Sequence, residues 1–381
     1  MSEWKKVSLD QMGTVSRGKS KHRPRNDARL FGGKYPFIQT GDIGSAGLYV
    51  NEFSQTYNEE GLAQSKLWEK DTLCITIAAN IADTALLAFP ACFPDSIMGF
   101  VADPKISNVK FVKYCFDILQ RDCKQISQGA AQDNLSWKKL STIEFPCPPI
   151  EVQHRIATIL SRYDSLIENY QKQIKLLEEA AQRLYKEWFV DLRFPGHENT
   201  KIVDGVPEGW TPSQLGQLAE FKRGKTITKK DVIDGDIPVV AGGLEPAYYC
   251  NKSNTAERVI TISGSGANAG FTRMYFEKVW ASDCSFVDVS VTPFLHFVYC
   301  YLKDNKTTID NMQKGAAQPH VYAKDINSLG LCIPIESILK SFEGKISKYF
   351  DSISSLQSQL RLLTEARDRL LPKLMSGEIE I

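Results

Sequence analysis

The sequence lacks a long apolar run, and it lacks cysteine pairs. No uncharged apolar segment approaches the roughly 20 residues that a membrane-spanning helix needs, and MSEWKKVSLD at the start has no signal-peptide core. The nine cysteines are scattered without a CxxC pair, and the five histidines are isolated. We therefore expect a cytoplasmic protein with reduced thiols and no zinc site.

Excess charge and catalytic motifs are also missing. The net charge is only +1, whereas a protein that held DNA alone would usually be more basic. No Ser/His/Asp or Cys/His constellation, Walker motif or nuclease pattern can be assembled from the spacing. These absences favour a non-catalytic protein without a cofactor of its own, whose DNA contacts, if any, are local or shared with partners.

Two long stretches have the apolar spacing of helices that bury a narrow seam. The first covers 150–189 and the second 335–375; about 40 residues at about 1.5 Å each give rods of roughly 60 Å. The expected seam residues are Ile159, Tyr163, Leu166, Tyr170, Ile174, Leu177, Leu184, Ile346, Phe350, Ile353, Leu360, Leu363 and Leu370. Each seam is the natural partner of the other, and the apolar side chains outside it, at Ile156, Leu160, Ile167 and Leu176, would form a docking surface.

The whole chain is an internal repeat. Lys175 to Ala180 (KLLEEA) matches Arg361 to Ala366 (RLLTEA), 186 residues later. We expect a mixed α+β fold with two duplicated globular domains separated by two long antiparallel helices that form a coiled coil. The expected parts are a first domain at 1–149, a central helix at 150–192, a linker at 193–209, a second domain at 210–333 and a C-terminal helix at 334–381.

Within the repeat, one segment varies while its surroundings are kept. The copies differ between 42–74 and 244–259, where the first copy is 17 residues longer. We expect this variation to lie in a loop on a repeated scaffold, which suggests two similar sites of different specificity. Strand-like runs lie at 73–77, 109–112, 239–241, 259–262 and 285–289. Helices are plausible at 110–121 and 293–303, the first in conflict with a strand at 109–112.

Basic, glycine-interrupted segments recur at corresponding positions in the two copies and suit contacts to phosphates. Both contain Arg-Gly-Lys, and the residues concerned are Arg17, Lys19, Lys21, Arg23 and Arg25 in the first copy and Lys222, Arg223, Lys225 and Lys229 in the second. Such segments can equally be solvated charged loops.

A second recurring stretch is Gly-Ala-Ala-Gln. Amide and imidazole side chains in or just after it could read adenine edges, and these are Gln132, Asn134, Gln318 and His320; the alternative is a structural turn. Gly264-Ser265-Gly266 fits a nucleotide-loop pattern, but no helix pattern follows it, so we expect a tight turn or a DNA-facing loop.

Together these features resemble the DNA specificity (S) subunit of type I restriction-modification enzymes. The resemblance covers the full chain and rests on the order of the parts: the Arg-Gly-Lys and Gly-Ala-Ala-Gln stretches of each unit, the long helix after it, and the 188–196 and 207–210 stretches, WFVDLRFPG and PEGW. It implies that each domain recognises one half of a bipartite, asymmetric site in double-stranded DNA.

The resemblance also implies partners. Two methyltransferase subunits would dock on the helices and bind S-adenosylmethionine themselves, and restriction subunits would add ATP- and Mg-dependent translocation and cleavage. Two other hypotheses stay open. One is a coiled-coil scaffold whose paired domains bind protein rather than DNA. The other is a free-standing methyltransferase, against which Pro146-Cys147-Pro148-Pro149 lacks the amide and the aromatic residue of the catalytic tetrapeptide.

Overall fold

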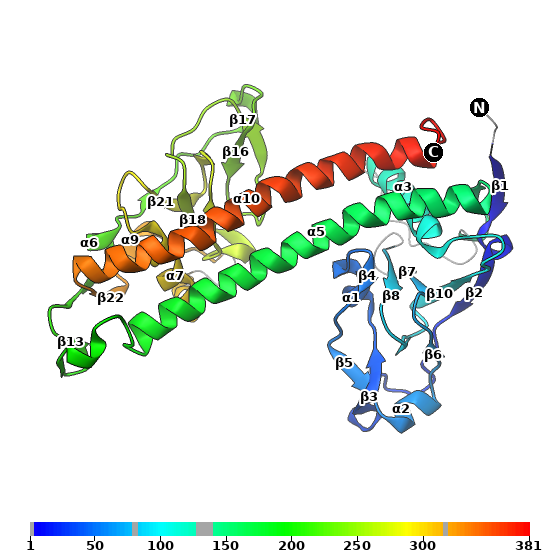
Figure 1. The fold of residues 1–381 in the computed structure, drawn as a ribbon, viewed down its shortest axis with the longest axis horizontal. Coiled ribbons are helices and arrows are strands. Elements are labelled where there is room, and N and C mark those ends of the chain that lie inside the picture. The colour runs from blue at the N-terminus through cyan, green and yellow to red at the C-terminus, as the bar shows by residue number, and fades with distance from the viewer. Residues whose placement is uncertain (1–3, 78–82, 127–139, 315–318) are drawn as a thin grey trace. The chain divides into compact units, whose positions relative to one another are not determined.

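The structure is a computed structural model that describes residues 4–77, 83–126, 140–314 and 319–381. Its contacts divide the chain into two compact units (Figure 1). Unit 1 is Met1–Gln171 with Gln359–Ile381, and unit 2 is Lys172–Ser358. Each unit therefore contains one globular domain together with a part of both long helices.

The domain of unit 1 is built on a five-stranded and a four-stranded sheet. The first has the order β2-β10-β7-β8-β4, with bounds Gly13–Arg17, Ile97–Ala102, Leu73–Thr76, Thr84–Leu87 and Tyr49–Val50. The second has the order β5-β3-β9-β6, with bounds Gln55–Tyr57, Phe31–Phe37, Ala91–Cys92 and Leu67–Trp68. β1 (Lys5–Ser8) pairs with β11 (Glu144–Cys147), and the helices are α1 (Thr40–Ser45), α2 (Glu59–Ala63) and α3 (Val109–Ile126).

The domain of unit 2 repeats this plan with fewer strands. Its main sheet has the order β15-β21-β18-β19, with bounds Lys222–Arg223, Cys284–Asp288, Val259–Ser263 and Thr272–Tyr275. A second sheet is β17-β16-β20, with bounds Tyr248–Cys250, Ile237–Val240 and Trp280–Ala281. Two strand pairs complete it: β14 (Thr211–Gln214) with β22 (Gly330–Ile333), and β12 (Ile202–Val203) with β13 (Val206–Pro207). The short helices are α6 (Leu215–Leu218), α7 (Leu295–Asp304), α8 (Lys306–Asn311) and α9 (Ala323–Asn327).

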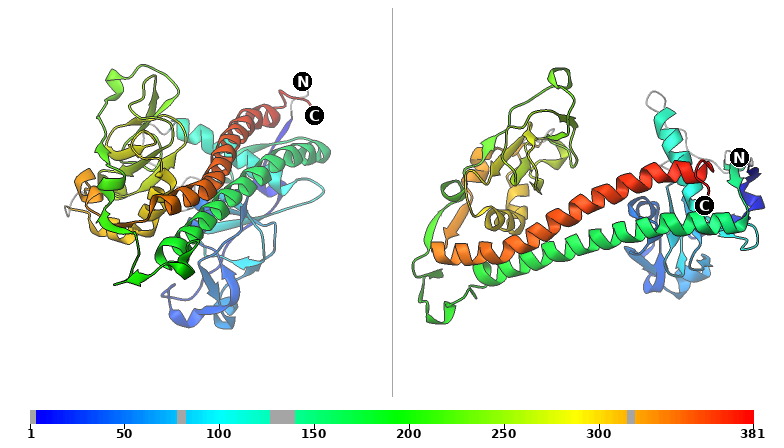
Figure 2. Two further views of the ribbon diagram at one scale, coloured as in Figure 1. Left: turned by 60° about the vertical axis from the view of Figure 1, so that its left-hand side comes forward. Right: turned by 45° about the horizontal axis from the view of Figure 1, so that its top comes forward.

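Two long helices, α5 and α10, are shared by the units. α5 covers Ile150–Tyr185 and continues as a π-helical turn at Lys186–Val190; α10 covers Glu336–Met375 (Figure 2). α5 has no internal Pro or Gly, and the chain leaves it through Gly196, whose φ of 89° favours glycine.

The two helices are antiparallel within each unit. In unit 1, Asp164 pairs with Arg367 at 2.8 Å, and nearer the start of α5 Arg155 reaches the backbone carbonyl of Ile381 at 3.1 Å. In unit 2, the rings of Trp188 and Phe342 lie 5.6 Å apart. The expected fold class, mixed α+β with two repeated domains and two long helices, is confirmed.

The buried face of α5 differs from the expected seam in its first half. Leu166 is 43% exposed, whereas Ile167 beside it is buried. Ile156 and Leu160, expected on a docking surface together with Ile167, are buried in the core of unit 1, and of that group only Leu176 is exposed. The reason is that α5 packs against its own domain as well as against α10, so its apolar stripe is wider and shifted from a two-helix seam.

The other expected seam residues are buried or half-buried. Ile346, Phe350 and Ile353 lie in the core of unit 2. The half-buried members are Ile159, Tyr163, Tyr170, Ile174, Leu177, Leu184, Leu360, Leu363 and Leu370.

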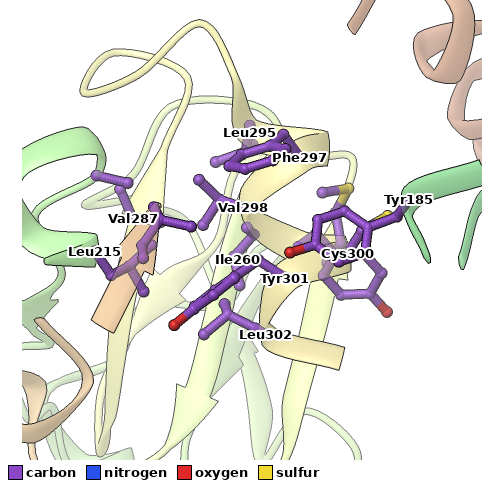
Figure 3. Close-up of a cluster of buried hydrophobic side chains, with 14 of the residues drawn as sticks. Tyr185, Leu215, Ile260, Val287, Leu295, Phe297, Val298, Cys300, Tyr301 and Leu302 are labelled. Carbon is purple, nitrogen blue, oxygen red and sulfur yellow. The ribbon is translucent and has the colours of Figure 1, made fainter. Parts of the chain in front are cut away.

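Each unit has its own hydrophobic core. In unit 2 this core joins α5 and α7 to the main sheet, and Figure 3 shows Tyr185 of α5 beside Cys300 of α7. In unit 1, Phe111 and Phe116 of α3 pack with Leu160 of α5 and Leu374 of α10. The core helix of each domain therefore lies between its sheet and the long helices.

Two local predictions need correction. The stretch at 109–112 is the start of α3 and not a strand, because Asn108 accepts the backbone N–H groups of Lys110 and Phe111 and so caps a helix. The variable segment at 42–74 is not a loop, since it contains β4, β5, α2 and β6 within the two sheets.

Candidate nucleic-acid interface

The ends of three strands meet at one edge of the main sheet in unit 2. Arg223 at the end of β15 is paired with Ser285 near the start of β21, and Ser263 at the end of β18 is paired with Cys284. The loops that leave these strands therefore start side by side. We call this end of the sheet, with residues 222–225, 264–268, 282–283 and His320, the unit 2 edge.

Backbone hydrogen bonds hold the Arg-Gly-Lys stretch of each copy against the sheet. Gly224 donates to the carbonyl of Cys284 at 2.8 Å, and Lys225 donates to Ala281 at 2.9 Å. In unit 1, Gly18 donates to Ile97 at 2.8 Å and Lys19 to Phe93 at 3.1 Å. The two copies therefore present the residues around this glycine in the same way.

The glycine of this stretch is required by close approach of the backbone. A Cβ atom on Gly224 would lie 2.4 Å from the carbonyl oxygen of Ser282, and a Cβ atom on Gly18 would lie 2.2 Å from that of Pro94. Neither distance is compatible with a side chain, so the motif has a structural reason that its sequence alone does not reveal.

The basic side chains of the Arg-Gly-Lys segment in unit 2 are exposed to solvent. Lys222, Arg223, Lys225 and Lys229 are all solvent-exposed, and among the residues that the structure describes none of them forms an ion pair. The indole N–H of Trp280 donates to the carbonyl of Lys225 at 2.7 Å and holds this turn. Four cations without a neutralising carboxylate can contact phosphates.

The basic segment of unit 1 is partly neutralised. Arg25 forms an ion pair with Asp95, and Arg23 lies 3.8 Å from the same carboxylate and also donates to the carbonyl of Ser20 at 2.7 Å. Arg17, Lys19 and Lys21 form no ion pair within the described part of the chain. Arg23 and Arg25 are thus bound to the protein itself, which sequence reasoning missed because Asp95 lies 70 residues from Arg25.

His22 of the same segment contacts Asp27 at 2.8 Å. Hydrogen bonds from Arg29 and from His22 lower the pKa of the Asp27 carboxyl well below its usual range. Asp27 thereby stays ionised and holds the loop in shape.

The Gly264-Ser265-Gly266 stretch is the turn between β18 and β19. Gly266 has a φ of 80°, and a strand rather than a helix follows, so the turn offers no helix N-terminus to a pyrophosphate. Ser265 bonds to Asp283, and its backbone bridges to His320. The turn belongs to the unit 2 edge.

His320 brings the end of the second Gly-Ala-Ala-Gln stretch to this edge. Its ring stacks on Tyr322 with the centroids 5.9 Å apart and an interplanar angle of 13°. Tyr322 is 41% exposed, and sequence reasoning did not single it out. Gln132, Asn134 and Gln318 lie outside the described residues.

The described residues contain no group of three or more His, Cys, Asp or Glu side chains that could hold a metal ion. Burial raises the pKa of the Cys284 thiol to about 12, so this thiol near the unit 2 edge is protonated at neutral pH.

None of the helices described is both long and apolar enough to cross a membrane. The arrangement can donate hydrogen bonds and positive charge to a ligand.

Comparison with known proteins agrees with this geometry. The family model of the type I restriction modification DNA specificity domain matches residues 1–179 and 207–363. The chain is 26% identical to the type I restriction enzyme MjaIX specificity subunit of Methanocaldococcus jannaschii, over 100% of this chain and 94% of that protein. It is 23% identical to the HindI specificity subunit of Haemophilus influenzae, over 100% of both chains.

Among solved structures, the S subunit of a type I restriction-modification system from M. genitalium has the same fold. The TM-score is 0.64 at 19% sequence identity, and the match covers 97% of this chain and 96% of that one. The repeat, the helix pair and the family match on both halves agree, so this chain belongs to the type I restriction-modification DNA specificity family and is a DNA sequence-recognition subunit.

Proposed function

We propose that the chain recognises a bipartite, asymmetric site in double-stranded DNA, with each domain contacting one half. The observation that carries this proposal is that each unit presents an Arg-Gly-Lys stretch at the end of an edge strand of its main sheet, β2 in unit 1 and β15 in unit 2. Equivalent backbone hydrogen bonds hold the two stretches. The segments at 42–74 and 244–259 differ between the copies, so the two half-sites would differ in sequence.

In this proposal the chain is the non-catalytic subunit of a larger cytoplasmic complex. Two methyltransferase subunits would supply S-adenosylmethionine and transfer a methyl group to adenine on opposite strands. Restriction subunits would supply ATP- and Mg-dependent translocation and cleavage. The near-zero net charge supports a shared interface, because a chain of +1 gains little affinity for DNA from its overall charge.

The long helices carry the surface that we assign to the partners. In unit 1, Leu166 of α5 and Leu362 of α10 are 43% and 61% exposed. In unit 2, Leu176 is 49% exposed and lines a groove with Leu177 and Leu356. Apolar side chains exposed on both helices are typical of a protein-binding face.

The decisive experiment is a map of adenine methylation across the host genome, with and without this gene. Deletion should abolish methylation at one bipartite motif, and re-introduction of the gene should restore it. If every methylated motif survives deletion while the partner methyltransferase is expressed, the recognition function proposed here is wrong, and a protein-binding scaffold would be the better hypothesis.

A second test separates free cations from neutralised ones. Replacing Lys222, Arg223 and Lys225 by Gln should weaken the salt dependence of DNA binding. The magnitude of the slope of log K against log salt concentration should fall by about 2 to 3, at about 0.9 per phosphate contact. Replacing Arg23 and Arg25 by Gln should reduce the magnitude of this slope by less than about 1, because both guanidinium groups already pair with the Asp95 carboxylate. The slopes are measured by fluorescence anisotropy on the complex with its methyltransferase; a larger effect from the second variant would contradict this assignment.

A further inference from the structure

The two long helices can be compared position by position. Residues 186 apart have equivalent burial: the buried residues Ile156, Leu160 and Ile167 of α5 correspond to the buried residues Phe342, Ile346 and Ile353 of α10. At the same spacing, Asp164 corresponds to Phe350, and Arg367 corresponds to Ala181.

In unit 1, this position is ionic. The Arg367 guanidinium lies 2.8 Å from Asp164, with only 10% of the Asp164 side chain and 28% of the Arg367 side chain exposed. The Tyr114 hydroxyl donates to the second oxygen of Asp164. Burial opposes the charge of Arg367, but Asp164 and the neighbouring Asp368, which Arg367 also holds at 2.9 Å, together outweigh burial, so the pKa of Arg367 is raised.

In unit 2, the equivalent position is apolar. Phe350 is 2% exposed, and Tyr299, which corresponds to Tyr114, meets it edge-on with the ring centroids 5.6 Å apart. Ala181 is 1% exposed and belongs to the same core. Equivalent positions of the repeat are thus occupied by an ion pair in unit 1 and by an aromatic contact in unit 2.

We propose that Asp164 and Arg367 select the partner of each long helix, so that α5 pairs with α10 and not with the α5 of a second copy of this chain. In the same antiparallel register, two α5 helices would place Asp164 of one chain against Ala181 of the other. Two α10 helices would place Arg367 against Phe350. The first like pairing buries Asp164 without its cation, which is strongly unfavourable, and the second leaves Arg367 with only Asp368 of its own helix, 2.9 Å away. The α5–α10 pairing satisfies both Asp164 and Arg367.

Lys113 on α3, which lines the same pocket as Asp164 and Arg367, is already paired. The Lys113 ammonium holds Asp117 at 2.7 Å, and its side chain is only 12% exposed. Burial raises the pKa of the Asp117 carboxyl, which Lys113 partly offsets, so releasing Lys113 to Asp164 would leave Asp117 without its cation. The proposed selection therefore rests on Asp164 and Arg367, which come from different helices.

The repeat itself supplies the test variant. In the full chain, Asp164→Phe with Arg367→Ala installs at unit 1 the residues that unit 2 uses. Two differently tagged full-length chains are co-expressed without partner subunits and purified over both tags in sequence. Wild-type chains should give only background in the doubly tagged fraction, and the double variant should raise that fraction about tenfold, because like pairing no longer isolates a charge.

Charge reversal is the matched control. Asp164→Arg with Arg367→Asp keeps one complementary pair between α5 and α10, so its doubly tagged fraction should stay at background. Equal exchange by both double variants, or background exchange by Asp164→Phe with Arg367→Ala, would overturn the proposal.

Thermal unfolding of the variants shows whether a change in exchange comes from loss of folding. Asp164→Phe alone and Arg367→Ala alone should each lower the Tm of unit 1 by about 5 °C, whereas their combination should restore most of that loss. If the combination does not fold, Asp164→Asn with Arg367→Gln removes the charges at similar size and should also raise exchange. Background exchange in that variant would equally overturn the proposal.

Discussion

A chain carrying Phe342→Ala should lose about 3 to 5 kcal/mol of the unfolding free energy of unit 2. Phe342 of α10 is fully buried, at 0% exposure. Its ring lies 5.6 Å from that of Trp188, 4.8 Å from Phe189 and 6.2 Å from Phe297. These neighbours come from the π-helical turn that follows α5 and from α7, so the deletion would leave a cavity where the long helices meet the core helix of the domain.

The measurement is denaturant unfolding followed by hydrogen exchange, which reports on each unit separately. Leu362→Ala is the matched control, because this residue of the same helix is 61% exposed and should change stability by less than about 0.5 kcal/mol. A loss below about 1 kcal/mol for Phe342→Ala would mean that α10 does not contribute to the core of unit 2 as described.

Gly224→Ala should lower the affinity of the complex for its DNA site by about ten- to a hundredfold, equivalent to about 1.4 to 2.8 kcal/mol. The added Cβ would lie 2.4 Å from the carbonyl oxygen of Ser282 and 2.6 Å from that of Ala281. Because these atoms are backbone, the Arg-Gly-Lys stretch must move away from Ala281 and Ser282 and lose its hydrogen bonds to Ala281 and Cys284, which displaces Arg223 and Lys225.

Affinity is measured with the complete methyltransferase complex on its methylated motif, once that motif is known. Gly330→Ala serves as the control, since a Cβ at Gly330 meets no atom within 4 Å and affinity should stay within about twofold of wild type. Wild-type affinity in a correctly folded Gly224→Ala variant would remove the unit 2 edge from the DNA interface.

Much of the fold could be predicted from local patterns. The strands at 73–77, 239–241, 259–262 and 285–289 all fall within two residues of the bounds of β7, β16, β18 and β21, because alternation and β-branched content act within a few residues. The stretch at 109–112 failed, because its Val and Phe residues suit a strand equally well and only the cap at Asn108 starts a helix.

The faces of the long helices could be predicted only in part. Counting a two-helix seam placed Leu166 inside and Ile167 outside, and the structure has them the other way round. The spacing of apolar residues indicates that a helix is amphipathic, but the position of its buried face depends on every element packed against it. Here α5 packs against domain residues as well as against the partner helix.

The candidate interface, too, could be predicted only in part. The basic stretches and their recurrence are visible in the sequence, and so is the lack of a helix after Gly264-Ser265-Gly266. Contacts across the fold decide that Asp95 holds Arg23 and Arg25, while the basic segment at 222–229 forms no ion pair among the described residues.

The sequence by itself determined the duplication, the two long helices and the family, because repeats, periodicity and motif order are properties of residues close together or at a constant spacing. Only the tertiary structure decided which charged side chains form ion pairs. Asp164 and Arg367 are 203 residues apart, and only folding places them 2.8 Å from each other. Electrostatic pairing acts through space at a few ångströms, so a linear pattern that repeats faithfully can still hold an ion pair in one copy and an aromatic contact in the other.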